Sequence, residues 1–408
     1  MPRINGERLI RRLRKFATFG AYKTGVHRPT YSPQDMESRR WLAAEYESVG
    51  LAAHIDGVGN VFGRSPRPGP AMLIGSHSES QNHAGWLDGA MGVIYGLEIA
   101  HAFSESEACR NMAIDPVAWS DEESHFVPFL GSRSFVGDLG QAEIDAARSR
   151  STGQPLREAL KEAGLDKLAC ETIRPERYAG YLEAHIEQGD SLEATGKRLG
   201  VVTSIVAIWQ YRIVIEGVQN HAGTTRMAIR RDAGMAAVRL AGLIDGSFPK
   251  AAGPRSVWTM GRLDLEPGAP SIIPGRATML FQFRDDEEAT LLRLEETLHG
   301  LVREASQMTG CEMTIERITA GQPLHMDASF QEALLAAARG HCPDGYVRMP
   351  SGASHDAQIL GRAIPAGMLF VPSIGGISHH WTEDTAEADL ILGCQVLADA
   401  AERILAGR

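Results

Sequence analysis

The stretch Met72-Leu-Ile-Gly-Ser-His-Ser-Glu-Ser80, followed by Gly85-Trp-Leu-Asp-Gly-Ala90, decides how this chain is interpreted. Its apolar start predicts a short strand, which ends in a polar turn that carries His77. A loop then brings in Asp88, and a helix is expected over residues 91–103. An imidazole and a carboxylate that leave one strand end suit a divalent metal ion. Most histidines near polar turns bind no metal, so a metal site needs partners from elsewhere in the chain.

Length and composition indicate a globular protein of more than one domain. The chain has 408 residues, of which 43% are hydrophobic and 23% charged, and a single core rarely serves that length. The net charge of -10 argues against nucleic acid and, weakly, against an anionic membrane, because both partners attract a positive surface. No apolar run is long enough to span a bilayer.

The cysteines and the N-terminus indicate a cytoplasmic location. The five cysteines are far apart and form no C-x-x-C pair, so neither a disulfide framework nor a cysteine-rich zinc site is expected. The basic stretch Arg8–Lys15 has no apolar segment after it, which distinguishes it from a secretion signal. We expect a surface helix over residues 4–17 instead.

Strands alternate with helices in the first and last parts of the chain. This order predicts an α/β fold with a mostly parallel sheet. In such sheets, functional sites form at the carboxyl ends of the strands. Strands are expected over 58–62, 71–74, 116–120, 181–184 and 368–371, with helices over 34–49, 155–163, 329–339 and 386–405.

The pattern between these parts predicts a second domain. Its elements follow the order β-α-β-β-α-β, which is typical of a ferredoxin-like α+β sandwich. We therefore expect a domain over 211–323 inserted into a catalytic domain that comprises 1–210 and 324–408. The expected strands are 211–217, 257–260, 277–284 and 313–318, and the expected helices are 232–243 and 286–307.

Polar groups that follow the expected strands could complete a metal site with His77 and Asp88. These groups are the acidic pair Glu122-Glu123, His185 and His379. Nitrogen and carboxylate ligands without thiolate suit zinc, manganese, cobalt or nickel in a hydrolytic centre. In the acidic pair, one carboxylate could bind metal while the other moves protons. An isolated acidic pair is usually a solvated turn, but this pair follows an apolar strand.

Taken together, the chain resembles the M20 metallo-hydrolases, in particular the N-carbamoyl-L-amino-acid hydrolases, β-ureidopropionases and allantoate amidohydrolases. The resemblance extends nearly from end to end, and its specificity comes from the order and spacing of short motifs. These motifs are Gly75-Ser-His77, Leu87-Asp-Gly89, Asp121-Glu-Glu123, Glu183-Ala-His-Ile-Glu-Gln-Gly189, Asn220-His-Ala-Gly-Thr-Thr225, Ile273-Pro-Gly275, Ser351-Gly-Ala-Ser-His-Asp-Ala357, and Gly376-Ile-Ser-His379 with Glu383.

The resemblance implies two divalent metal ions, a homodimer and a lid and dimerisation role for the inserted domain. His77 and His185 would hold one ion, Glu123 and His379 the other, and Asp88 would bridge them. Glu122 would be the general base that activates water and then protonates the leaving nitrogen.

Further residues match family positions around the substrate. His221 would reach across the dimer interface and help to bind the oxyanion. Gln188 and Arg284 would bind the polar end of the substrate, with Arg284 taking a carboxylate bidentately. An ion pair with Asp285 or Asp286 is the alternative for Arg284. His355 and Asp356 would position the substrate or support the site from outside the ligand shell.

Three positions depart from the family pattern. Glu79 stands where the family has an aspartate that orients the metal-binding histidine. Ser271 replaces an asparagine that helps to bind the substrate carboxylate, and Arg226 replaces a proline. These changes suggest a substrate other than a simple carbamoyl amino acid, with an extra acidic group for Arg226 or a ring that packs on Trp86. Alternatively, Arg226 points to solvent.

The expected function is metal-dependent hydrolysis of a C–N bond in a ureido or amide group of a small carboxylated molecule. An aminoacylase or dipeptidase-like activity, which would release a carboxylic acid, is the first alternative. A non-catalytic relative that only binds a ligand is the second.

Overall fold

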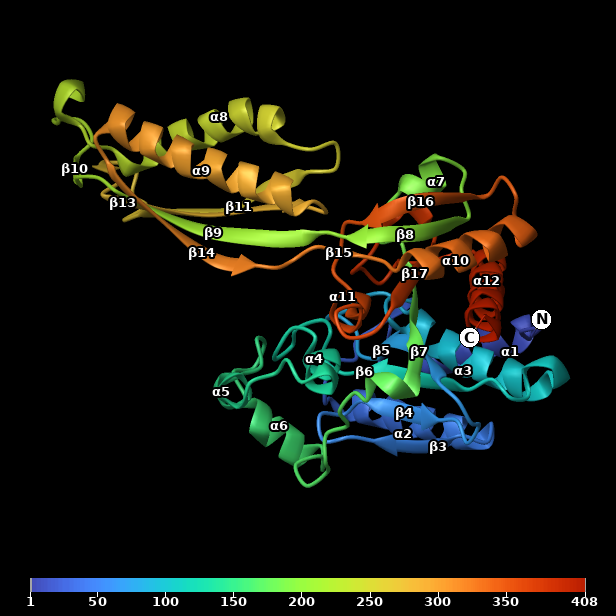
Figure 1. The fold of residues 1–408 in the computed structure, drawn as a ribbon. Coiled ribbons are helices and arrows are strands. Elements are labelled where there is room, and N and C mark those ends of the chain that lie inside the picture. Colours follow the sequence, from blue (N-terminus) through green and yellow to red (C-terminus); the bar gives the residue numbers. More distant parts are fainter. Residues whose placement is uncertain (1, 408) are drawn as a thin grey trace. The chain divides into compact units, whose positions relative to one another are not determined.

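The computed structural model describes residues 2–407, which form two compact units (Figure 1). The first unit extends to Thr203 and resumes at Met326, and the second is Ser204–His325. The chain therefore leaves the first unit once and returns to it once, as an inserted domain requires.

A mixed β-sheet forms the centre of the first unit. Its strand order is β15-β8-β17-β7-β5-β6-β4-β3, with β16 beside β8. The end of β8 and the edge strand β15 are the segments by which the chain passes to and from the second unit. The four central strands, β17, β7, β5 and β6, are parallel, and the strands on either side of them are antiparallel. The strand bounds are β3 Ala52–Ile55, β4 Val61–Arg64, β5 Ala71–His77, β6 Ile114–Trp119, β7 Tyr178–Ile186, β8 Leu199–Ile205, β15 Leu324–His325, β16 Tyr346–Ser351 and β17 Ala366–Val371.

Helices cover the central strands, and every residue of these four strands is buried. Burial on both faces explains why they read as continuous apolar runs. Helix α2 begins as expected, because Ser32 accepts a hydrogen bond from the Asp35 amide and Pro33 occupies the first turn. The helices of this unit are α1 Gly6–Phe16, α2 Pro33–Ser48, α3 Ala90–Glu105, α4 Leu130–Val136, α5 Gln141–Ala146, α6 Leu156–Glu162, α7 Ser191–Ala194, α10 Ala328–His341, α11 Asp356–Leu360 and α12 Glu387–Ala406.

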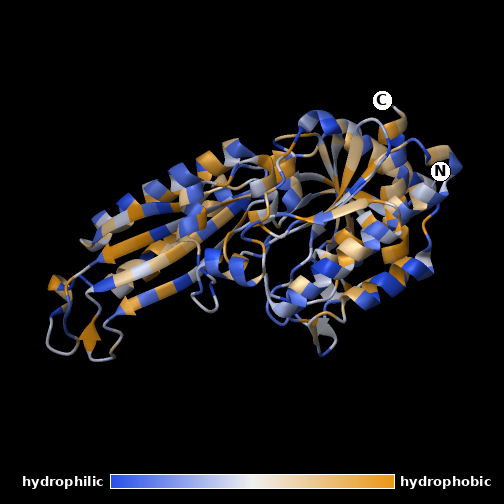
Figure 2. Ribbon diagram, turned by 90° about the horizontal axis from the view of Figure 1, so that it is seen from below, coloured by the Kyte–Doolittle hydropathy of each residue, from blue (hydrophilic) through white to orange (hydrophobic). Residues whose placement is uncertain are grey.

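The second unit is an antiparallel sheet with two long helices on it. The sheet order is β11-β13-β9-β14, which is that of a ferredoxin-like sandwich. Figure 2 shows hydrophilic and hydrophobic residues alternating along its helices, as expected when one helix face packs on a sheet. The elements are β9 Ala207–Glu216, α8 Ala233–Ala251, β11 Val257–Glu266, β13 Arg276–Asp285, α9 Glu288–Thr309 and β14 Glu312–Ala320.

One expected strand is wrong in its position. The sequence predicts a strand over 58–62, but β4 begins only at Val61. The reason is Asp56, whose carboxylate accepts hydrogen bonds from the amides of Val58 and Asn60 and so holds this segment in a turn.

No helix among the described residues is long and apolar enough to cross a membrane.

Candidate metal centre

The parallel strands deliver the candidate ligands to one edge of the central sheet. His77 is the last residue of β5, and His185 is the penultimate residue of β7. The acidic pair follows the end of β6, and Asp88 lies just before α3. Because carboxyl ends of parallel strands meet at the same edge, residues far apart in the sequence come together here.

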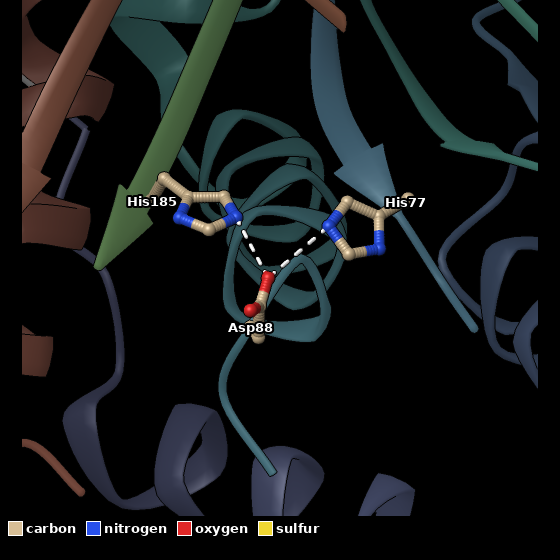
Figure 3. A group of neighbouring side chains, drawn as sticks. All are labelled: His77, Asp88 and His185. Carbon is tan, nitrogen blue, oxygen red and sulfur yellow. Dashed lines mark ion pairs between the residues drawn. The ribbon is translucent and has the colours of Figure 1, made fainter. Parts of the chain in front are cut away.

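Three buried side chains form the first group (Figure 3). The Asp88 Oδ1 atom lies 3.2 Å from His77 Nε2 and 3.1 Å from His185 Nε2. The Nδ1 atoms of the two rings face main-chain carbonyls, those of Glu79 at 3.3 Å and Ile186 at 2.9 Å. These carbonyl bonds orient both rings so that Nε2 points toward Asp88. The three ligand atoms lie close enough together to hold one metal ion.

A second group uses the other oxygen of Asp88. Its Oδ2 atom lies 3.3 Å from His379 Nε2, which lies 3.5 Å from Glu123 Oε1. The Oε2 atom of Glu123 accepts a hydrogen bond from Gln81, whereas the buried Oε1 has no hydrogen-bond partner in the part of the chain that the structure describes. A buried carboxylate oxygen without a partner is unusual in a folded protein. A cation between Asp88, Glu123 and His379 would satisfy it.

Glu122 lies beside these groups at a longer distance. Its Oε2 atom is 3.8 Å from His77 Nε2, which is too far for a hydrogen bond. Burial raises the pKa of the Glu122 carboxyl well above its usual range, and neighbouring Glu123, Asp356 and Asp88 add to the effect, while His77 opposes it. A carboxyl group with a raised pKa can take up and release protons near neutral pH.

The cluster carries more acidic than basic groups. Burial works to raise the pKa of Asp88, but hydrogen bonds from His185, His379 and His77 outweigh it, and the pKa lies well below its usual range. For Glu123, burial and the charge of Asp88 raise the pKa despite His77 and His379. Carboxylates packed together with too few counter-charges fit a site for divalent cations.

The backbone is held in an unfavourable conformation at several positions of this site. Asp121, Ser124, Gln188 and His379 have φ angles of 57°, 63°, 59° and 55°. Non-glycine residues seldom adopt this left-handed conformation, and those that do cluster at functional sites. Each of the four belongs to a loop that carries or adjoins a candidate ligand.

Several polar residues support the ligands. Gln188 and Glu383 lie in motifs of the sequence, whereas Gln81 carries no sequence signal of its own. Gln81 binds Glu123, as described above. Gln188 Nε2 donates to Asp88 Oδ2 at 2.9 Å and to the hydroxyl of Ser378 at 3.2 Å. Glu383 Oε1 accepts from the Asp88 amide at 3.1 Å, and burial raises the pKa of Glu383 to about 8. Gln188 and Glu383 therefore hold both the side chain and the main chain of Asp88.

His355 and Asp356 lie behind the ligands and are buried. The ring of His355 packs 4.6 Å from that of His185, and its Nε2 atom bonds the hydroxyl of Ser351 at 3.0 Å. Only 2% of His355 and 0% of Asp356 is exposed. Both residues are therefore enclosed by the protein, and His355 contacts His185 and Ser351.

Trp86 and three further histidines lie near the site. Trp86 is only 3% exposed, and the guanidinium of Arg14 lies 4.1 Å from its ring centroid, so the idea of a substrate ring packing on Trp86 is wrong. His83, His125 and His380 belong to none of the metal-capable groups found among residues 2–407. His125 bonds the carbonyl of Ser80 instead.

Three of the four candidates in the second unit lie together. His221 pairs with Ile272 in a two-stranded ladder, and the amide of Ala222 donates to the carbonyl of Ser271. The His221 Nδ1 atom accepts from the amides of Gly223 and Thr224 at 3.0 and 3.1 Å, which leaves the proton of the ring on the exposed Nε2 atom. Arg226, on the same turn, is exposed.

Arg284 lies near the other end of β13 from this ladder. The ladder adjoins the start of β13, where Gly217 bonds Gly275 and Arg276 pairs with Glu216. Arg284 follows eight residues later, which corresponds to about 26 Å along a strand. Asp286 pairs with Arg255. His221 and Arg284 of one copy therefore do not meet at one small molecule.

The comparison with known families decides the identity of the fold. The family described as peptidase family M20/M25/M40 matches residues 50–403. The chain belongs to this family. Within it, allantoate amidohydrolase of Bacillus subtilis (strain 168) is 32% identical over 394 residues, which cover 94% of each chain. N-carbamoyl-L-amino acid amidohydrolase of Geobacillus stearothermophilus is 30% identical over 404 residues, which cover 97% of each chain.

A solved structure supports the same assignment within the M20 family. An amidase of the hydantoinase/carbamoylase family from Burkholderia phymatum matches with a TM-score of 0.94 and 48% sequence identity, covering 100% of this chain and 99% of that one. The family and the branch predicted from the sequence motifs are thus confirmed. Among residues 2–407 of this M20 chain, the His, Asp and Glu cluster could hold metal.

Proposed function

We propose that the protein is a two-metal amidohydrolase that cleaves a C–N bond of a ureido or amide group in a small carboxylated molecule. The observation that carries this proposal is the Asp88 carboxylate, whose two oxygens face two separate groups of potential ligands. Glu122 lies beside both groups with a raised pKa. The names of the similar enzymes support the same reaction class.

The donor set fits two divalent ions of zinc, manganese, cobalt or nickel. His77, His185 and Asp88 would hold one, and Asp88, Glu123 and His379 the other. When bound, the ions supply Lewis acidity: they lower the pKa of water toward roughly 7 and polarise a carbonyl group.

The protein's own residues would bind the substrate and move its protons. Glu122 would accept a proton from the attacking water and deliver it to the leaving nitrogen. This role requires a carboxyl group that alternates between its ionised and protonated forms. Gln188 would contact the polar end of the substrate beside Asp88. His221 would donate a hydrogen bond from Nε2 to the developing oxyanion. Arg284 would bind the substrate carboxylate, with Ser271 and Arg226 near His221.

A panel of substrates tests the reaction class. N-carbamoyl amino acids, allantoate and N-acyl amino acids are incubated with the protein, and the release of ammonia is compared with the release of carboxylic acid. We expect ammonia from at least one ureido substrate, loss of activity with EDTA and recovery with zinc or manganese. Release of carboxylic acid from N-acyl amino acids alone would support the aminoacylase alternative. A metal-free protein that ignores EDTA would support ligand binding without catalysis.

Metal binding is expected to strengthen as the pH rises from about 6 to about 8. The hydrogen bond to Asp88, together with the charges of Glu123, Asp88 and Glu383, raises the pKa of His379 to about 9 despite burial. In the metal-free protein this ring therefore holds an extra proton at neutral pH, and an ion must displace it. Each displaced proton makes the affinity rise about tenfold per pH unit below that pKa.

Isothermal titration in two buffers of different ionisation enthalpy measures the protons released. We expect about one proton fewer from His379→Ala than from the wild type. The neighbouring His380→Ala is the matched control and should release as many as the wild type. Equal proton release from all three proteins would contradict the assignment of His379 as a ligand.

A homodimer through the inserted unit is part of the proposal. Strand β11 is an edge of its sheet, and exposed edges with apolar side chains are usually covered by another chain. Met235 and Val238 on α8, and Val257 and Met260 on β11, are 43–62% exposed. A second copy would cover these residues and bring its own His221 to the site.

A further inference from the structure

Glu79 does not orient the ring of His77 in the way that its position predicts. The Nδ1 atom of His77 faces the main-chain carbonyl of Glu79 at 3.3 Å. The carboxylate Oε1 atom of Glu79 is 3.6 Å from the same nitrogen, which is beyond a hydrogen bond. The ring orientation is thus set mainly by the main chain, and the carboxylate has other partners.

The carboxylate of Glu79 binds the main chain of the acidic pair. Its Oε1 atom accepts a hydrogen bond of 2.7 Å from the Glu122 amide and a longer one of 3.4 Å from the Glu123 amide. Glu79 is 0% exposed, so water does not compete for these bonds. Hydrogen bonds to an ionised acceptor are among the stronger ones in proteins.

The turn that carries the acidic pair needs an acceptor from outside itself. The carboxylate of Asp121 accepts the amides of His125, Phe126 and Val127 at 2.7–2.9 Å. These bonds leave the amides of Glu122 and Glu123 without an acceptor from Asp121, and both amides point to Glu79 instead. Because buried amides need acceptors, Glu79 completes the hydrogen bonding of the turn.

Helix α2 holds the far side of the Glu79 carboxylate. Arg39 Nη2 lies 3.4 Å from Glu79 Oε2, while its Nε atom donates to Asp35 at 2.8 Å and its Nη1 atom to the carbonyl of Gly59 at 2.6 Å. All three charged side chains are fully buried. Arg39 is thus fixed by two other acceptors and presents its remaining nitrogen to Glu79.

We propose that Glu79 is a positioning residue for Glu122 and Glu123, which it holds by their main-chain amides, with Arg39 as its anchor. This inference rests on the roles proposed above for the acidic pair. It explains why the chain has glutamate here. An aspartate is shorter by one C–C bond, about 1.5 Å. It would lose the hydrogen bonds from the amides of the acidic pair, whereas the contact between the main-chain carbonyl and the His77 ring would remain.

Amide hydrogen exchange of the metal-free protein tests the contact directly. We expect Glu79→Asp to raise the exchange rate of the Glu122 and Glu123 amides by on the order of tenfold, because a hydrogen bond to a buried charged acceptor is lost. Glu383→Asp is the matched control, since it shortens another buried glutamate of the same site that binds the Asp88 amide instead. It should leave exchange at the acidic pair unchanged.

Kinetics and metal binding give the second readout. We expect Glu79→Asp to lower kcat by about 10–100-fold with little change in KM, and to weaken binding of the ion at Glu123 by a similar factor. Arg39→Lys keeps the charge but loses the planar fork, so it should show the same changes to a smaller extent. If Glu79→Asp does not fold, the same measurements on Arg39→Lys test the positioning role.

The outcomes separate this inference from the proposed function. Unchanged exchange at both amides in Glu79→Asp, or equally faster exchange throughout the protein, would overturn the positioning role. Faster exchange confined to residues 121–127, together with weaker metal binding at Glu123, would support it, even if the wild type hydrolysed no ureido substrate and the proposed function failed. Faster exchange with wild-type kcat and wild-type metal affinity would also overturn it. In that case, the hydrogen bonds to the Glu122 and Glu123 amides would not control the position of their carboxylates.

Discussion

Replacing Glu122 by glutamine is expected to lower kcat by about a thousandfold while both metal ions stay bound. General acid–base groups contribute about 10²–10⁴ to enzymatic rates. Glutamine keeps the size of the side chain and one acceptor oxygen, but it cannot take a proton from water or give one to a leaving nitrogen. The raised pKa of the Glu122 carboxyl fits this exchange of protons near neutral pH. Steady-state kinetics together with metal analysis by mass spectrometry measure both parts of the prediction.

The neighbouring Glu123→Gln is the matched control. Its Oε1 atom is a buried oxygen without a hydrogen-bond partner among residues 2–407, and it lies in one potential ligand group with Asp88 and His379. This substitution is therefore expected to lose one ion as well as activity. Loss of metal from Glu122→Gln would contradict the assignment, because Glu122 would then be a ligand together with His77.

The sequence was sufficient to predict that these side chains gather at one edge of the sheet. Each ligand follows or ends an apolar strand, and in a parallel sheet that spacing brings the ligands together. The supporting residues could not be predicted in this way. Gln81 and Ser378 are ordinary polar residues in turns, and only the folded structure shows that they contact Glu123 and Gln188.

The contacts of Glu79 and His355 also could not be predicted from the sequence. The motif around each residue predicts that it is near the metal centre, which it is. The motif does not predict on which side of a histidine ring the residue lies. His355 lies behind His185, and Glu79 reaches past His77 to residues more than forty positions later in the chain.

The start of the inserted unit differs from the prediction for a related reason. The alternating pattern that predicts a strand begins at Tyr211, whereas the compact unit begins at Ser204. Residues 199–209 form one mostly apolar segment, in which β8 ends at Ile205 and β9 begins at Ala207. The two strands pair in different sheets. Hydrophobic periodicity cannot locate a change of sheet partner within a continuous run.

Replacing His221 by alanine is expected to lower kcat by about 10²–10³, with a smaller effect on KM. This is the usual cost of removing one donor to an oxyanion, because the bond strengthens only as the charge develops. The amides of Gly223 and Thr224 fix the proton of the ring on its exposed Nε2 atom, as a donor requires. His325→Ala, which removes another exposed histidine of the same unit, should change kcat little.

Mixed dimers then test whether His221 serves the other copy. The ladder that carries His221 adjoins the start of β13, and Arg284 lies about 26 Å further along that strand. A site that uses both residues would therefore draw them from two copies. In a dimer of one Glu122→Gln chain and one His221→Ala chain, one site has both defects and the other has none. Random pairing makes half of the dimers mixed, so the mixture should regain about a quarter of wild-type activity.

Co-expression of the two variants with different affinity tags provides the mixed dimers, and each variant purified alone provides the baseline. Isolating the doubly tagged species should raise its activity to about half of the wild-type value, because every such dimer then has one intact site. Activity no higher than the sum of the two separate variants would show that each His221 serves its own chain. In that case, the apolar residues of α8 and β11 would need a different explanation, because the proposed dimer would no longer account for the position of His221.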